Sequence, residues 1–161
     1  MNENIASYLE RESIGRKDLY KLLEEHFFTL TINDFKYLLN VHPRAKSFCS
    51  LGKVLCLLIA VCEYFNIEYS EILSTSRKKP LPYSRFIFCY IISKTITTSS
   101  GNKLSAFIDK AHDFMDYSKK EVTKSIDARS ELYFDYRNIE EKFNELIIQH
   151  NLNYNPYEQQ S

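Results

Sequence analysis

Hydrophobic residues recur three and four positions apart along most of this chain, a spacing that places them on one face of an α-helix. We therefore predict an all-α fold, a helical domain of about six or seven helices that includes a helix-turn-helix. The candidate helical segments are residues 16–28, 33–42, 53–65, 70–74, 82–96, 104–112, 118–129 and 130–150.

One of these segments, Lys53 to Phe65, is apolar around its whole circumference and is predicted to be the central buried helix. Polar residues that precede the other segments are candidate N-caps, because their side chains accept hydrogen bonds from the first backbone N–H groups. The predicted caps are Asn33 or Asp34, Ser70 and Ser118.

The segments 104–112 and 118–129 have the outline of a helix-turn-helix: a short helix, a bend and a second helix with a basic outer face. Ser118 and Glu121 form an S-x-x-E capping box that is predicted to open the second helix. This helix is expected to turn three lysines toward solvent, namely Lys119, Lys120 and Lys124.

Charge is unevenly distributed although the chain is neutral overall. Residues 76–129 carry eleven basic and five acidic side chains, whereas the flanking parts are acidic. The basic region begins in a loop, Ser76 to Pro82, which cannot be helical at its centre because Pro80 and Pro82 bracket Leu81. Such asymmetry favours a local anionic partner, with nucleic acid the first candidate. The alternative interpretation is an ordinary solvated helix surface.

The length of the chain favours one globular domain, or one domain with a helical appendage, and the spacing of its cysteines favours a reducing compartment. Apolar residues make up 44% of the chain and glycines number only three, which argues against disorder and against a fold rich in turns. The apolar run from Val54 to Val61 is too short to span a membrane, and the polar N-terminus does not resemble a secretory signal. We therefore expect a cytoplasmic protein without membrane contact.

Candidate chemistry is sparse. The four cysteines have no zinc-ligand spacing and are predicted to be buried thiols, and the four histidines are scattered without a paired carboxylate motif. His112, Asp113 and Asp116 could together form a metal site, but a polar turn with an N-cap aspartate is the favoured interpretation. We predict no enzyme activity, no metal and no cofactor.

Residues 54 to about 148 resemble the C-terminal DNA-binding domain of the bacterial replication initiator DnaA. The loop Ser76-Arg77-Lys78-Lys79 leads into a helix that starts with Arg85, and the separation of Arg77 and Arg85 by eight matches a pair of loop and helix arginines in that family. The apolar helix after Arg85 is similar to a long apolar helix of the family. The segment Asp116-Tyr117-Ser118-Lys119 stands where the family has an Asp-His-Thr-Thr signature.

The chain departs from that family in several places. Tyr117 replaces the signature histidine and Lys119 replaces the second threonine. The predicted turn between the two short helices is several residues longer than in the family, and no GxxxxGK[ST] phosphate loop occurs. The resemblance implies a stand-alone double-stranded DNA-binding module in replication, or in regulation of a phage or mobile element. It implies phosphate or groove contacts by Arg77, Lys78, Lys79, Arg85, Ser118, Lys119, Lys120 and Lys124, with Lys119 the expected base contact.

The predicted organisation has three parts: an N-terminal helical extension (residues 1–50), the DnaA-like domain (51–150) and a polar tail (151–161). The extension is a candidate for self-association or for binding a protein partner. The alternative function is a helical protein-interaction module without nucleic-acid binding, which would present exposed aromatic residues, with Tyr133, Phe134 and Tyr136 as candidates.

Overall fold

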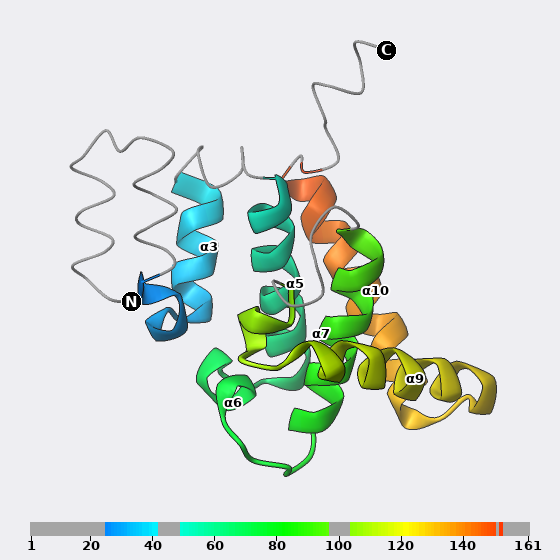
Figure 1. Cartoon of the computed structure of the whole chain (residues 1–161). Helices are drawn as coiled ribbons and strands as arrows, with labels where there is room; N and C mark the ends of the chain where they lie inside the picture. Colours follow the sequence, from blue (N-terminus) through cyan, green and yellow to red (C-terminus); the bar gives the residue numbers. More distant parts are fainter. Residues whose placement is uncertain (1–24, 42–48, 97–103, 151, 153–161) are drawn as a thin grey trace.

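The structure is a computed structural model that describes residues 25–41, 49–96, 104–150 and 152, and in these ranges the chain is helical with no strand (Figure 1). The predicted all-α class is confirmed. The α-helices are α3 (Ile32–Val41), α5 (Cys49–Phe65), α6 (Tyr69–Leu73), α7 (Leu81–Thr95), α9 (His112–Ala128) and α10 (Glu131–Gln149), and the short 3-10 helices are η1 (Phe27–Thr29) and η2 (Ala106–Ile108). Most of the predicted 16–28 helix and of the tail lies outside the described residues.

Helix α5 is the centre of the domain, as its apolar run predicted, although it begins at Cys49 rather than Lys53. Every residue from Val54 to Cys62 is buried. The helix contacts α3 on one side and α7 and α10 on the other (Figure 1). None of the described helices is both long enough and apolar enough to cross a bilayer.

Two predicted N-caps are wrong by a few residues. Helix α3 begins at Ile32, where the Thr31 backbone N–H donates to Asp34 Oδ2 at 2.7 Å and the Asp34 N–H donates to Thr31 Oγ1 at 3.3 Å. Thr31 therefore caps the helix and Asp34 completes a capping box. In α6 the cap is Glu68, paired with Glu71, rather than Ser70.

Helix α9 differs most from the sequence prediction, because it begins at His112 and runs without interruption through Ser118. The preceding segment is a single turn, closed at Asp109, whose φ of 56° is left-handed. The predicted capping box at Ser118 is wrong: the Ser118 hydroxyl donates to the Phe114 carbonyl at 2.7 Å, inside the helix. The bend between the two helices is therefore the short stretch 109–111, not a long turn before Ser118.

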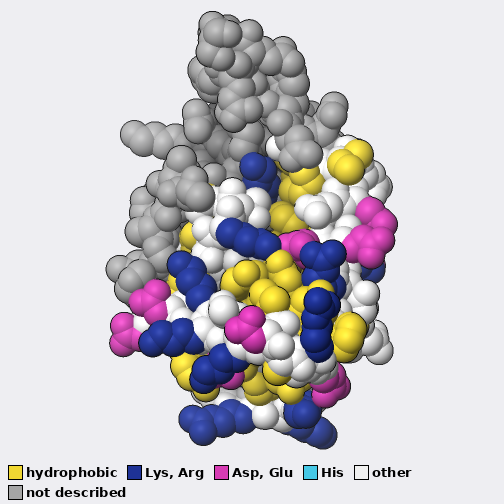
Figure 2. All heavy atoms as spheres, turned by 90° about the vertical axis from the view of Figure 1, so that its right-hand side faces the viewer, with side chains coloured by type: hydrophobic (Ala, Val, Ile, Leu, Met, Phe, Trp, Pro, Cys, Tyr) yellow, Lys and Arg dark blue, Asp and Glu magenta, His cyan; other side chains and the backbone are white. Residues whose placement is uncertain are grey.

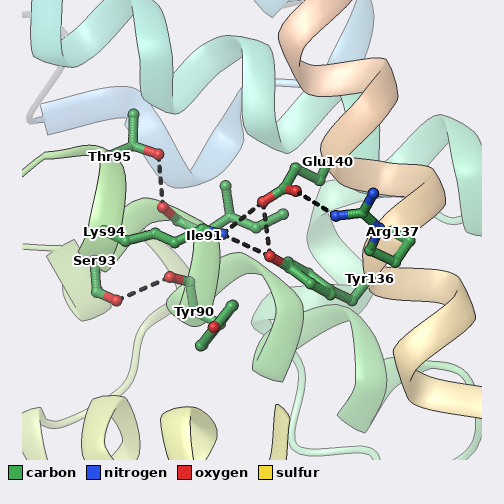
Figure 3. Close-up of polar contacts among 8 residues, drawn as sticks. All are labelled: Tyr90, Ile91, Ser93, Lys94, Thr95, Tyr136, Arg137 and Glu140. Carbon is green, nitrogen blue, oxygen red and sulfur yellow. Dashed lines mark hydrogen bonds and ion pairs between the residues drawn. The ribbon is translucent and has the colours of Figure 1, made fainter. Parts of the chain in front are cut away.

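Helices α7 and α10 are joined by a polar network in their contact zone (Figure 3). Lys94 Nζ lies 2.6 Å from both the Tyr136 hydroxyl and Glu140 Oε2, and the Tyr136 hydroxyl donates to Glu140 at 2.8 Å. Tyr136 is buried against the core, whereas Phe134 is exposed. The network fixes α10 against α7, the helix that follows the basic loop.

Candidate nucleic-acid interface

Arg85 lies beneath the basic loop and is only 4% exposed. Its guanidinium donates to four backbone carbonyls: Nε to Ile72 at 2.8 Å, Nη1 to Ser76 at 2.7 Å, and Nη2 to Ser74 at 2.7 Å and Glu71 at 3.2 Å. Burial lowers the pKa of Arg85, and the carbonyl dipoles compensate the desolvated charge. The side chain therefore points inward and holds the loop, and in this structure it is not placed for the phosphate contact that the resemblance implies.

The loop itself presents its cations to solvent. Hydroxyl groups order its backbone, since the Ser76 N–H donates to Ser74 Oγ at 3.3 Å and the Lys78 N–H donates to Ser76 Oγ at 3.2 Å. Arg77, Lys78 and Lys79 are all exposed. Arg77 and Lys78 form no ion pair with a carboxylate in the described part of the chain. The loop is thus a set of three exposed cations on an anchored backbone.

The same loop lies beside the junction of α9 and α10. Glu131 is the first residue of α10, and its Oε2 atom lies 3.7 Å from Lys79 Nζ. The same Nζ atom lies 5.2 Å from the ring centre of Tyr83. Arg129, which ends α9 with a left-handed φ of 53°, is two residues before Glu131. The structure therefore brings together the basic loop and the C-terminal end of α9, which are about fifty residues apart in the sequence.

The outer surface of α9 carries both signs of charge. The three expected lysines are exposed, and so are three aspartates on the same helix: Asp113, Asp116 and Asp127. Lys124 also pairs with Glu121 at 3.5 Å. Ser118 is fully buried and faces α7, so in this structure it is not placed for the groove contact that the resemblance implies. The exposed part of the predicted site is Arg77, Lys78, Lys79, Lys119, Lys120 and Lys124.

Aromatic side chains lie among these cations, a feature that sequence reasoning missed. Figure 2 views the molecule from the side toward which α9 projects in Figure 1, and shows lysine and arginine side chains around an apolar patch with a few carboxylates between them. On α7, the side chains of Tyr83, Phe86 and Tyr90 are half-buried, and Tyr117 on α9 is 52% exposed. The sequence did contain a signal for this feature. The spacing of Tyr83, Phe86 and Tyr90 places three aromatic side chains on one face of the same helix.

No group of three or more His, Cys, Asp or Glu that could hold a metal occurs among the described side chains. The side chain of His112 lies outside the described set. The described thiols of Cys56, Cys62 and Cys89 are buried as predicted, and burial raises the pKa of Cys89 to about 12.

No protein-family model, curated protein or solved structure matches this chain. The resemblance to the DnaA domain rests on the loop, on the long apolar helix and on the Asp116-Tyr117-Ser118-Lys119 segment. Of the residues that carry it, Arg85 and Ser118 are interior and the loop cations are exposed.

Proposed function

We propose that this protein binds double-stranded DNA, chiefly through the phosphate backbone, with the basic loop as its principal contact. The observation that carries the proposal is the anchoring of the loop by Arg85, which leaves Arg77, Lys78 and Lys79 exposed on a fixed backbone. A preordered loop loses less conformational entropy on binding than a flexible one. Cations held in this way neutralise phosphates and release condensed counterions.

Helix α9 supplies the second contact in this proposal. Its lysines, together with Arg129, lie along or beside a groove, and Lys119 is the residue assigned to a base edge. The same surface carries three exposed aspartates, Asp113, Asp116 and Asp127. Their carboxylates would repel DNA phosphates if the whole length of α9 lay against the duplex. Contacts from the loop should therefore dominate affinity. By its resemblance to the DnaA domain, the proposed role extends to DNA replication or to regulation of a phage or mobile element.

Fluorescence anisotropy of a labelled duplex across a salt series tests this proposal. With about five phosphates neutralised, log K should fall with log salt at a slope of about −4 to −5. Lys78→Gln should weaken binding and reduce the magnitude of the slope by about 1. Lys36→Gln is the matched control, because Lys36 is an exposed lysine on α3, far from the loop in sequence, and its substitution should change neither quantity.

Two duplexes, one random and one carrying a DnaA-box-like sequence, separate specific from non-specific binding in the same experiment. If wild type binds the two duplexes with different affinities and Lys119→Ala abolishes that difference, α9 makes a base contact through Lys119. Absence of binding to either duplex at low salt would overturn the proposal.

A helical protein-interaction module is the second candidate, and the exposure of apolar residues on α10 favours it. Phe134 is 56% exposed and Ile148 is 69% exposed, both on this helix. They lie fourteen residues apart, about 21 Å along the helix, with Glu141 and Glu145 exposed between them. These residues form no continuous apolar patch, so the DNA proposal ranks first.

A further inference from the structure

Aromatic rings from α7 and α9 lie on the face that carries the basic residues, and three of them are in mutual contact. Phe86 stacks on Phe114, with ring centres 5.8 Å apart, and meets Tyr117 edge-on at 5.5 Å. One turn away on each side of Phe86 lie Tyr83 and Tyr90, both half-buried. We call these five residues the aromatic shelf. Its ring of greatest exposure is Tyr117, at 52%.

Cations lie directly against the rings of this shelf. Lys79 Nζ is 5.2 Å from the ring centre of Tyr83, Lys94 Nζ is 5.0 Å from that of Tyr90, and Lys110 Nζ is 5.6 Å from that of Phe114. Each distance is within the range of a cation–π interaction. From Tyr83 to Tyr90 the shelf follows seven residues of α7, or about 10 Å. This length corresponds to several base spacings of about 3.4 Å along a strand.

The carboxylates beside the shelf are partly neutralised. Glu121, one turn beyond Tyr117, pairs with Lys124 at 3.5 Å, and Glu140 pairs with Lys94 at 2.6 Å. Asp113, one turn before Tyr117, and Asp116, directly before it, are both exposed. Lys110, at one end of the shelf, forms no ion pair in the described part of the chain, and Lys79, at the other end, makes a long contact of 3.7 Å with the exposed Glu131. An anionic ligand is therefore attracted mainly to these two ends, where it competes with Glu131 for Lys79.

We infer that the aromatic shelf binds single-stranded nucleic acid, with a base stacked on Tyr117 and phosphates held by Lys79 and Lys110. The inference rests on the proposed nucleic-acid binding and adds a second mode to it. Alternating cations and aromatic rings suit an unpaired strand, because its bases present their faces, whereas those of a duplex are stacked on each other. The basic loop is shared by the two modes, since Lys79 belongs to both.

The test compares three labelled ligands of equal length: oligothymidylate, an abasic oligonucleotide with the same phosphates, and a duplex. Wild type should bind oligothymidylate about 5- to 150-fold more tightly than the abasic strand, the range expected for one stacked base. Tyr117→Leu should remove this advantage while leaving duplex affinity within about twofold. The chain has no tryptophan but twelve tyrosines, so the part of the quenching of tyrosine emission that Tyr117→Leu removes reports stacking on Tyr117.

Phe134→Leu is the matched control, because Phe134 is an aromatic residue of similar exposure on α10 outside the shelf. It should leave all three affinities unchanged. Equal affinity of wild type for oligothymidylate and the abasic strand overturns the stacking inference, and duplex binding in the same experiment shows that the proposed function survives. If no ligand binds, both proposals fail.

Discussion

Arg85 donates from Nη1 to the backbone carbonyl of Ser76 at 2.7 Å, which fixes the start of the basic loop to the helix that follows it. The same guanidinium also donates to the backbone carbonyls of Ile72 and Ser74. At the C-terminal end of α6, the buried Arg85 side chain thus supplies hydrogen-bond donors that backbone N–H groups would supply in a longer helix. Arg85 thus holds the loop from beneath, and the cations of the loop itself remain exposed.

Replacement of Arg85 by alanine should lower the free energy of unfolding by about 2–4 kcal/mol, because several carbonyls would lose their donor while remaining partly buried. Arg85→Lys should recover only part of this loss, since one ammonium group cannot reproduce the planar fork of donors. Urea denaturation followed by far-UV circular dichroism measures both changes.

Limited proteolysis with trypsin supplies a second readout for the loop. Cleavage after Arg77 and Lys78 should be faster in Arg85→Lys than in wild type, because local opening of the loop becomes less costly. Arg137→Ala, which removes an arginine whose side chain is 60% exposed, is the control and should change stability by less than about 0.5 kcal/mol. An unchanged cleavage rate in Arg85→Lys would contradict the anchoring role.

Local sequence signals predicted much of the fold. The apolar run of α5 required burial on all sides, and Pro82 is in the first turn of α7, where its missing N–H has no cost. At Ser118 two local signals conflicted. The S-x-x-E motif favoured a helix start, but Met115, Ser118 and Val122 form one buried face, and packing of that face on α7 extends the helix back to His112.

The candidate site was only partly predictable, because exposure depends on tertiary contacts. Arg77 and Arg85 look alike in the sequence, each a basic residue beside a serine. The acceptors that bury Arg85 are carbonyls 9 to 14 residues earlier, and no residue pattern encodes their positions. The aromatic shelf was hidden for a similar reason, since its rings come from two helices that meet only in the folded chain.

The capping box of α3 gives a prediction that separates two neighbouring polar residues. Thr31→Ala should cost about 1 kcal/mol, because it removes the hydroxyl that accepts the Asp34 N–H. Asn33→Ala, at an exposed position inside the helix, should be within about 0.5 kcal/mol of wild type. Chemical denaturation of both variants checks the prediction, and a larger loss for Asn33→Ala would restore Asn33 as the cap.

The contact of Lys94 with Glu140 predicts a pH dependence of stability. Burial raises the pKa of Glu140, but hydrogen bonds from Lys94 and Tyr136 outweigh burial and lower it below its ordinary value. A lowered pKa contributes stability that is present above the unfolded-state pKa, about 4, and is lost as pH falls through the folded-state pKa. Wild type should therefore lose stability on acidification faster than Glu140→Gln.

The expected difference between wild type and Glu140→Gln at neutral pH is about 1 kcal/mol, and it should shrink below about pH 4. Thermal unfolding at a series of pH values measures it. Glu141→Gln, an exposed neighbour on the same helix, serves as control and should follow the wild-type profile. A gap that stays constant down to the lowest pH would show that Glu140 contributes through packing rather than charge.

Helix α9 can be tested for the orientation that places Ser118 inside. Ser118→Lys should lower the free energy of unfolding by about 3 kcal/mol or more, because a charge would be forced against α7 beside the Cys89 thiol. Thr123→Lys, at an exposed position of the same helix, should change it by less than about 0.5 kcal/mol. Denaturant unfolding of the two variants decides between the orientations, because a helix that turned Ser118 toward a DNA groove would accept lysine at both positions.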